Sequence, residues 1–319
     1  MRVLLAGGAG FLGSHLADTL IARGDHVVAV DNLVTGRLSN VDHLLGHERF
    51  NLVEWDITAD LPAMSTLGPR FDAVLDFASP ASPDDFKTMP LEILAVGSTG
   101  TRNLLERAKS DDAVFYLAST SEVYGDPLVH PQPESYWGNV SSTGPRSCYD
   151  EAKRFSEALT MAYHRVHGID IRIVRIFNTY GERMRPQDGR VVNTFVCQAL
   201  RGEPLTLHGD GEQTRSFCHV SDEVRGLVAL LDSGHQKPVN IGNPDEFTMR
   251  ELAELVLELT GSSSPIMTIP LPPEREGDPA QRRPDITLAR DLLNWTPEID
   301  LREGLSRMIH HFRTIEGIG

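Results

Sequence analysis

The sequence predicts an α/β fold in which a doubly wound parallel sheet is followed by a smaller C-terminal α/β region. Two observations predict this fold. Short apolar runs, typical of strands buried on both faces, alternate with segments of helical spacing through residues 1–178. After residue 178 the pattern loosens, and Pro and Gly become more frequent. The alternation implies a parallel sheet with right-handed crossovers.

In chain order, strands are expected at residues 3–6, 27–30, 51–55, 73–77, 113–117 and 171–177. Helices are expected at residues 11–23, 91–109 and 152–166. A further helix spans residues 248–260, where Thr248 and Glu251 match a capping box and Gly261 fits the residue after the helix end. Residues 270–284 are rich in Pro and Arg and are expected to form a loop over a site.

A glycine-rich loop, Gly7-Gly8-Ala9-Gly10-Phe11-Leu12-Gly13, joins the first strand to the first helix. Gly7 permits a tight turn, Gly10 lets the backbone approach a pyrophosphate, and Gly13 lets the helix pack closely on the strand. The helix N-terminus adds amide groups and positive potential for the anion. The loop predicts a Rossmann-type dinucleotide-binding domain at residues 1–178. Residues 179–319 are expected mainly to bind the substrate, with some segments packing back on the first domain.

An acidic residue, Asp31, ends the second strand 18 residues after Gly13. A carboxylate there can accept hydrogen bonds from both ribose hydroxyls and would repel a 2′-phosphate, so NAD is favoured over NADP. The alternative is a structural turn followed by a solvated aspartate.

Tyr149 and Lys153 are four residues apart, so they share one face of a helix. An unperturbed tyrosine pKa of about 10 is too high for a base at neutral pH. A nearby ammonium and the positive nicotinamide ring would stabilise the phenolate, and Tyr149 is therefore expected to accept a hydroxyl proton. The pair gains specificity because it opens the helix after the strand that ends near Thr120, at the sheet edge where ligands of such folds bind.

The composition of the chain argues against several other classes of protein. The net charge of −15 argues against a nucleic acid partner. No apolar run is long enough to span a membrane, and no signal peptide precedes the first strand. The three cysteines, Cys148, Cys197 and Cys218, are far apart and predict a reducing compartment, the cytoplasm. Neither the cysteines nor the histidines have a metal-site spacing, so no metal is expected.

Ten stretches of the chain together resemble the extended short-chain dehydrogenase/reductase family and, within it, the UDP-glucuronate decarboxylases, which make UDP-xylose. The resemblance covers nearly the whole chain. The stretches are residues 7–13, 31–37, 78–83 (ASPASP), 118–127 (ASTSEVYGDP), 144–153 (GPRSCYDEAK), 175–180 (RIFNTY), 188–192 (DGRVV), 213–216 (QTRS), 239–244 (VNIGNP) and 282–286 (RRPDI). Members of this family are homodimers joined through two long helices, which correspond here to residues 91–109 and 152–166.

The loop, the Tyr-Lys pair and the resemblance together give the expected sites. The expected cofactor-binding residues are Gly7, Gly10, Phe11, Leu12, Gly13, Asp31, Asn32, Thr35, Gly36, Asp56, Ile57, Ala78, Ser79, Tyr149 and Lys153. The expected substrate-binding residues are Ser121, Asn178, Arg190, Val191, Arg215 and Arg282. The expected catalytic residues are Tyr149, Lys153, Thr120, Glu122 and Arg282.

The resemblance implies that NAD oxidises C4 of the glucuronic ring, CO2 leaves from C5 as electrons flow into the new ketone, C5 is protonated, and the hydride returns to C4. Thr120 and Tyr149 are suited to hold the C4 oxygen as its charge grows. Glu122 resembles the glutamate assigned to decarboxylation, and Arg282 resembles the arginine that faces the sugar. The alternatives are purely structural roles: a strand-end contact for Thr120, a helix cap or ion pair for Glu122, and a solvated or structural charge for Arg282 and Arg215.

Three other functions are compatible with the fold. A 4,6-dehydratase resembles this chain but carries Thr-Asp-Glu, where this sequence has Thr120-Ser121-Glu122; serine is a poor proton donor for a departing hydroxyl. A 4-epimerase of a UDP-uronate or another sugar nucleotide shares Tyr149 and Lys153 and has no need for Glu122 or Arg282. A uronic-acid epimerase must in addition suppress the loss of CO2, so product analysis separates it from a decarboxylase. A catalytically silent NAD sensor would not need this set of residues.

One stretch departs from the family. The helix after the Ser-Pro repeat commonly carries Lys-Thr-Asn, and this chain has Ala95-Val96-Gly97. The lost lysine places the uronic acid configuration and the nucleotide base, UDP or TDP, in question.

Overall fold

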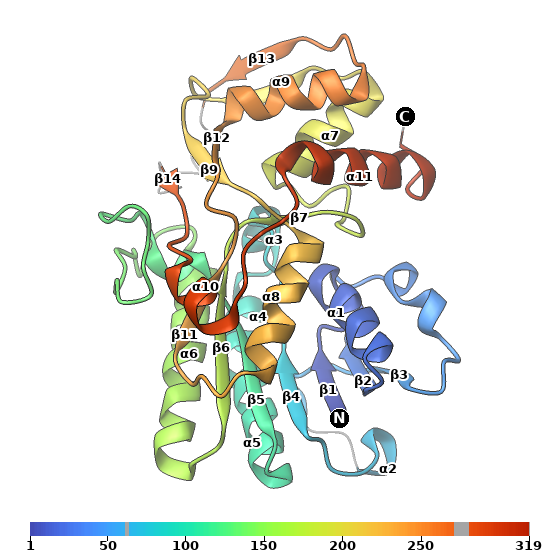
Figure 1. Cartoon of the computed structure of the whole chain (residues 1–319), viewed down its shortest axis with the longest axis vertical. Helices are drawn as coiled ribbons and strands as arrows, with labels where there is room; N and C mark the ends of the chain where they lie inside the picture. Colours follow the sequence, from blue (N-terminus) through green and yellow to red (C-terminus); the bar gives the residue numbers. More distant parts are fainter. Residues whose placement is uncertain (61–63, 271–280, 319) are drawn as a thin grey trace.

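The structure, a computed structural model, describes residues 1–60, 64–270 and 281–318 (Figure 1). Its main element is a seven-stranded parallel sheet with the order β11-β6-β5-β4-β1-β2-β3, which confirms the predicted doubly wound fold. The strand order reverses between β1 and β4, and this creates a crevice at their carboxyl ends. The strands are β1 (Arg2–Ala6), β2 (His26–Asp31), β3 (Phe50–Glu54), β4 (Ala73–Asp76), β5 (Val114–Thr120), β6 (Ile171–Ile176) and β11 (Pro238–Ile241).

Helices cover both faces of the sheet, so successive strand residues enter different cores. Leu5 packs in a core that also contains side chains of α1 (Phe11–Ala22), α8 (Val220–Asp232) and α10 (Thr287–Leu293). Leu4 packs on the opposite face, with side chains from α5 (Thr101–Asp111) and α6 (Ser147–His167). Because both faces are covered, the central strands are mainly apolar.

The expected helix at residues 91–109 is interrupted. It consists of α4 (Pro90–Ala95), a π-helical turn η3 (Val96–Gly100) and α5 (Thr101–Asp111). The expected helix at residues 152–166 is longer than predicted, because α6 (Ser147–His167) begins five residues earlier. The smaller elements before and between these helices are η1 (Leu38–Asn40), η2 (Asp42–Leu44), α2 (Met64–Leu67), α3 (Pro83–Thr88) and η4 (Ser121–Tyr124).

The C-terminal part forms its own core, which lies above the sheet in Figure 1. The capping box at Thr248 and Glu251 is present, and Gly261 has the left-handed conformation expected after a helix end. Residues 179–319 also return to the sheet as β11, α8 and α10. The other elements are β7 (Thr179–Tyr180), α7 (Val191–Arg201), β8 (Leu205–His208), β9 (Thr214–Ser216), β10 (Cys218–His219), β12 (Glu246–Thr248), α9 (Met249–Thr260), β13 (Ile266–Ile269), β14 (Gln281–Arg282) and α11 (Leu301–Thr314).

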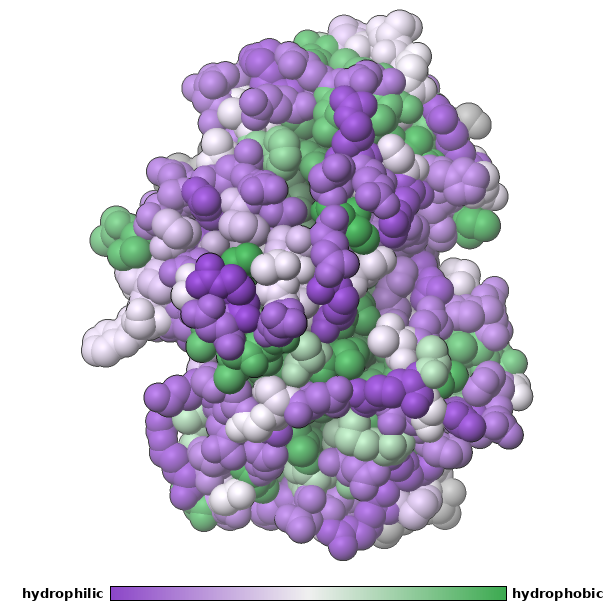
Figure 2. Space-filling model, in the orientation of Figure 1, coloured by the Kyte–Doolittle hydropathy of each residue, from purple (hydrophilic) through white to green (hydrophobic). Residues whose placement is uncertain are grey.

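The expected loop at residues 270–284 lies mostly outside the described residues. Its described end is not a loop: Gln281 and Arg282 form β14, which pairs in parallel with β9. Figure 2 shows that hydrophilic side chains cover most of the displayed face, while apolar side chains are most visible near the middle of the molecule.

Candidate active site

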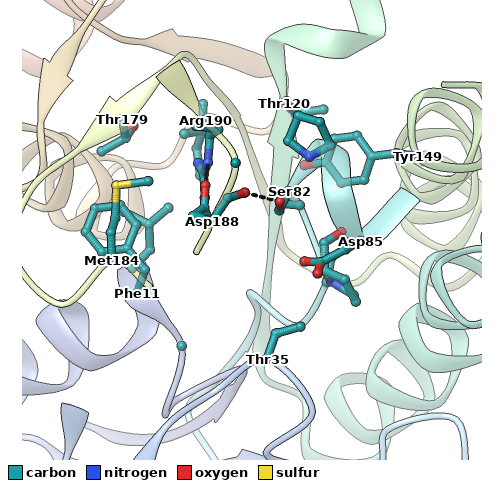
Figure 3. A pocket seen from close by; sticks show the side chains of 18 of the residues that line it. Phe11, Thr35, Ser82, Asp85, Thr120, Tyr149, Thr179, Met184, Asp188 and Arg190 are labelled. Atoms are coloured by element: carbon teal, nitrogen blue, oxygen red, sulfur yellow. Dashed lines mark hydrogen bonds and ion pairs between the residues drawn. The ribbon is translucent and has the colours of Figure 1, made fainter. Parts of the chain in front are cut away.

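A cavity of about 700 Å³ lies between the carboxyl ends of the parallel strands and the C-terminal part of the chain. Every residue predicted for the site lines this cavity except Gly36. Figure 3 shows Thr120 and Tyr149 close together, Asp188 and Arg190 facing them across the cavity, and Phe11 on another wall. Residues that are far apart in the sequence therefore share one site.

The glycine-rich loop has the close packing that the sequence predicts. Gly7 has a φ of +77°, which favours glycine. A Cβ on Gly13 would collide with the carbonyl oxygen of Gly7. Helix α1 follows Gly10 with no side-chain cap and no acidic residue in its first turn, so its amide groups and positive end face the cavity without competition from a carboxylate. This geometry fits a pyrophosphate.

Asp31 is held by two backbone amides at the end of β2. Ala9 donates to Oδ2 over 3.0 Å and Leu33 donates to Oδ1 over 2.9 Å. Each carboxylate oxygen can accept a second hydrogen bond, as a ribose diol requires. A Cβ on Gly36 would lie 2.5 Å from Oδ1, so this glycine lets its loop pack behind Asp31 rather than lining the cavity.

A second acidic residue supports the same end of the cavity. Asn32 donates to Asp56 Oδ2 over 3.1 Å, and the amide and hydroxyl of Thr58 donate to Oδ1. These hydrogen bonds outweigh burial and lower the pKa of Asp56. With Asp31, this arrangement fits a dinucleotide that carries free ribose hydroxyls.

Tyr149 lies on α6 with its ring stacked on Phe86 at a centroid distance of 4.9 Å. Burial raises the pKa of Tyr149 to about 12, although a hydrogen bond with Thr120 and the charge of Arg190 oppose the increase. The phenol is therefore protonated in the protein alone, and added positive charge is needed before it can act as a base at neutral pH.

Lys153 lies one turn further along α6 and is also buried. Its Nζ donates to the carbonyl oxygen of Ala118 over 3.0 Å and lies 5.9 Å from the centre of the Tyr149 ring. Burial lowers the pKa of Lys153, while the charge of Asp76 raises it.

Glu122 forms the third part of the site, between two arginines. Arg146 donates to Oε2 over 2.6 Å and Arg282 donates to the same atom over 3.3 Å. Burial raises the pKa of Glu122, but the charges of Arg282 and Arg146 outweigh burial and hold the pKa at about 2. Glu122 is thus an anion at any ordinary pH.

Arg282 is 1% exposed and uses its guanidinium to hold the strand end. It donates to the carbonyl oxygens of Ser121 and Gly125, the latter over 2.7 Å, as well as to Glu122. Arg282 therefore positions the η4 segment in addition to lining the cavity.

The remaining predicted substrate residues lie on the C-terminal side of the cavity. Arg190 forms an ion pair with Asp188, and Asn178 donates to the carbonyl of Ser216 over 3.4 Å. Arg215 donates to the carbonyl of Thr214 over 2.8 Å, and Val191 begins α7. Both guanidinium groups line the cavity, and guanidinium groups suit the binding of a diphosphate.

The sequence analysis missed a set of side chains that join the start of α3 to the segment 185–188 across the cavity. The hydroxyl of Ser82 donates to the carbonyl of Asp188, and Arg185 donates to Asp85 over 2.7 Å. Arg146 was also missed, although it lies inside the matched stretch 144–153. No local spacing indicates these contacts, because their partners are 24 to about 100 residues apart.

At the stretch that departs from the family, Ala95 and Val96 line the cavity. Gly97 instead faces α6: a Cβ there would lie 2.8 Å from the Cβ of Ala152. The small residue lets the π-helical turn approach the helix that carries Tyr149.

In the described ranges 1–60, 64–270 and 281–318, no group of three or more His, Cys, Asp or Glu side chains is arranged to hold a metal ion. Among the same residues, no helix combines the length and apolar character needed to cross a membrane.

The dinucleotide loop, the Tyr149–Lys153 pair and the cavity at the strand ends define a nucleotide-sugar enzyme of the extended short-chain dehydrogenase/reductase class. The family model described as GDP-mannose 4,6 dehydratase matches residues 4–308. UDP-glucuronic acid decarboxylase 1 of Arabidopsis thaliana is 51% identical over 313 residues, which cover 98% of this chain and 70% of the relative. The chain belongs to the UDP-glucuronic acid decarboxylase family.

Solved structures with the same fold carry related activities. UDP-glucose 4-epimerase of Thermotoga maritima, solved with UDP-glucose, superposes with a TM-score of 0.89 at 31% identity, covering 98% of this chain and 99% of that chain. UDP-glucuronic acid 4-epimerase of Bacillus cereus, solved with UDP-glucuronic acid and NAD, superposes with a TM-score of 0.88 at 29% identity. The match covers 99% of this chain and 100% of that chain.

Proposed function

We propose that this chain catalyses the NAD-dependent decarboxylation of UDP-glucuronate to UDP-xylose through a 4-keto intermediate. One observation carries the proposal: a single cavity holds both the Tyr149–Thr120 hydroxyl pair and the Glu122–Arg282 ion pair. The first pair suits oxidation and reduction at C4, and the second suits the loss of carboxylate at the neighbouring carbon. The decarboxylase relatives support this assignment.

The residues at the carboxyl ends of β1 and β2 would hold the cofactor. Amides at the start of α1 would bind its pyrophosphate, and Asp31 would accept hydrogen bonds from a ribose. NAD, when bound, supplies a hydride acceptor that later returns the hydride, together with the positive charge of its oxidised ring.

Tyr149 accepts the proton of the C4 hydroxyl and returns it when the ketone is reduced. Its high pKa means that the phenolate needs positive charge nearby, and Lys153 and Arg190 supply part of it. Thr120 hydrogen-bonds to Tyr149 and can donate to the C4 oxygen as negative charge develops there.

Oxidation at C4 places the C5 carboxylate β to a ketone, so CO2 leaves as electrons move to the C4 oxygen. Glu122 is held as an anion and therefore orders a water rather than donating its own proton. Arg282 keeps Glu122 in place, and the ordered water delivers a solvent proton to C5. Arg215, Arg190 and Asn178 orient the UDP moiety from the opposite wall.

Nuclear magnetic resonance of the purified protein with UDP-glucuronate and NAD tests the proposal. We expect UDP-xylose anomeric signals and loss of the carboxylate without net NADH. UDP-galacturonate as the product would identify a 4-epimerase, the activity named for the Bacillus cereus structural relative, and would make Glu122 and Arg282 binding residues. A control with Thr120→Val is expected to lower the rate and leave the product unchanged.

The proposal also includes an oligomeric state, a homodimer, and a cellular compartment, the cytoplasm. A homodimer through α4, α5 and α6 is supported by exposed apolar side chains on two of these helices, Leu91 at 75% and Phe155 at 50% exposure. The cytoplasm is supported by three free, buried cysteines, Cys148, Cys197 and Cys218.

A further inference from the structure

A buried carboxylate lies at the end of the strand next to the catalytic lysine. Asp76 is 2% exposed and is the last residue of β4. It pairs in register with Leu117 of β5, and the next residue of β5, Ala118, accepts the hydrogen bond from Lys153 Nζ. The sheet register therefore brings Asp76 to the level of the lysine head group.

Hydrogen bonds connect Asp76 to the helix that carries Lys153. The hydroxyl of Thr101 donates to Asp76 Oδ2 over 2.8 Å and lies 3.3 Å from the hydroxyl of Ser156. Ser156 is three residues after Lys153, on the same face of α6, and donates to the carbonyl of Gly97 over 2.7 Å. This chain of contacts runs from β4 through α5 and the π-helical turn to α6.

Asp76 has no cation of its own in the described part of the chain. Its Oδ1 accepts no side-chain hydrogen bond there, and no ion pair within 4 Å includes it. Burial raises the pKa of Asp76, whereas the charge of Lys153 and hydrogen bonds from Thr101 and the Ala78 amide oppose the increase. The other acids near Lys153 are already paired: Glu157 with Arg175 at 2.8 Å, and Glu122 with Arg146 at 2.6 Å.

Asp150, on α6, lies 3.9 Å from the same arginine as Glu122. The charged group that faces Lys153 from the sheet is thus Asp76. Removing one of two opposite buried charges leaves the other without compensation, so the two charges stabilise each other.

We propose that Asp76 is a positioning residue for catalysis: its buried carboxylate keeps Lys153 in the charged form that holds the cofactor and supports Tyr149. The proposal rests on the function proposed above. Asp76 touches neither substrate nor cofactor in this role, because it does not line the cavity. It acts through the charge of Lys153 and through the contacts of Thr101 and Ser156.

The test is the pH dependence of NADH binding by fluorescence titration of the full chain, between pH 6 and 10. Wild type and Asp76→Asn are compared. Without the anion, Lys153 loses its proton at lower pH, so we expect the alkaline loss of NADH affinity to begin about one pH unit lower or more in D76N. Lys153→Met should show no such step, which assigns the step to the lysine.

Asp111→Asn is the matched control. Asp111 is also a buried acid, 5% exposed, but it pairs with Arg107 over 2.6 Å and lies outside the cavity. D111N is expected to lower stability and leave the pH step in place. An unchanged step in D76N would overturn the proposal and leave Asp76 a structural residue.

A second variant decides the question if D76N is too unstable for the NADH titration. Asp76→Asn combined with Lys153→Met removes both charges. If the two groups are partners, this double variant folds better than D76N, with a coupling of about tenfold or more in the folding equilibrium constant. A double variant no more stable than the additive sum would refute the pairing. Both tests omit the sugar, so a failure to convert UDP-glucuronate would count only against the proposed function.

Discussion

At the scale of single residues, the proposed chemistry depends on the hydroxyl of Tyr149. Tyr149→Phe keeps the ring stacked on Phe86 and removes only the proton acceptor. We expect unchanged NADH affinity and a fall in turnover of about 100-fold or more, a typical contribution for a positioned base. An activity assay and an NADH titration of the same preparation measure the turnover rate and the NADH affinity. Wild-type turnover in this variant would contradict the assignment of the base.

Asp150 is expected to make stability depend on pH. Burial, and then the charge of Glu122, raise the pKa of Asp150 from 3.8 to about 7. Between these values the folded chain binds a proton that the unfolded chain has released, so stability falls as the pH rises from about 4 to about 7. Asp150→Asn removes this dependence. In urea unfolding, the free energy of unfolding of Asp150→Asn minus that of wild type is expected to be larger at pH 8 than at pH 4.5, by about 1 kcal/mol or more.

Asp170 provides a control of opposite sign. Although burial opposes it, hydrogen bonds from Arg172 and Gln236 lower the pKa of Asp170. Because this contribution is lost only as the pH falls below about 4, Asp170→Asn should be more destabilising at pH 8 than at about pH 3. If the stability of Asp150→Asn depends on pH in the same way as that of wild type, the Asp150 carboxyl group is ionised in the folded chain.

Sequence spacing reveals the site only where contacts are local. Tyr149 and Lys153 are one helical turn apart, so their common face was predictable. The charge state of Glu122 was not, because it depends on Arg146 and Arg282, which are 24 and 160 residues away. A motif indicates which groups are present, whereas a pKa depends on burial and on neighbours that only the fold brings together.

At the scale of elements, the π-helical turn η3 shows a limit of periodicity. Residues 90–111 have helical spacing throughout, and one extra residue in a turn changes that spacing too little to be recognised. The reason for the turn lies in packing, since Gly97 meets Ala152 of α6. The departure from the family at residues 95–97 is thus partly a helix-packing feature, and only Ala95 and Val96 reach the cavity.

The contact of Ser82 and Asp85, at the start of α3, with the segment 185–188 is expected to control the release of the bound dinucleotide. Asp85 is 7% exposed, so Arg185→Gln leaves a buried charge without its ion pair and weakens the join across the cavity. We expect NADH to dissociate about tenfold faster, measured by stopped-flow fluorescence. The double variant Asp85→Asn with Arg185→Gln should recover part of the loss, because no buried charge is left unpaired.

Arg290→Gln is the matched control for this loop contact. Arg290 pairs with Asp291 at 2.8 Å, but both side chains are more than half exposed, and such pairs contribute little. Equal NADH release from Arg185→Gln, Arg290→Gln and wild type would show that the loops do not retain the dinucleotide.

At the scale of the whole molecule, the six strands of the first 178 residues were predictable because each is centred on apolar residues and alternates with segments of helical spacing. The seventh strand, β11, and the two-residue strand β14 were not. Both are short and are defined by partners far along the chain, β6 and β9, rather than by their own pattern. The C-terminal chain therefore completes the sheet and carries Arg282 to the strand end of the first domain.

The last prediction concerns the association of two copies of the chain. Leu91 and Leu94, three residues apart on α4, share one face, and so do Phe155 and Val166, eleven residues apart on α6; all four are at least 40% exposed. Apolar side chains repeated along helix faces favour association with a second copy. We expect wild type to have the mass of a dimer by light scattering and Phe155→Glu to have the mass of a monomer. Leu128→Glu, in a loop at 82% exposure, should stay dimeric. A monomeric wild type would exclude this interface, whereas a dimeric Phe155→Glu would place the contact on another surface.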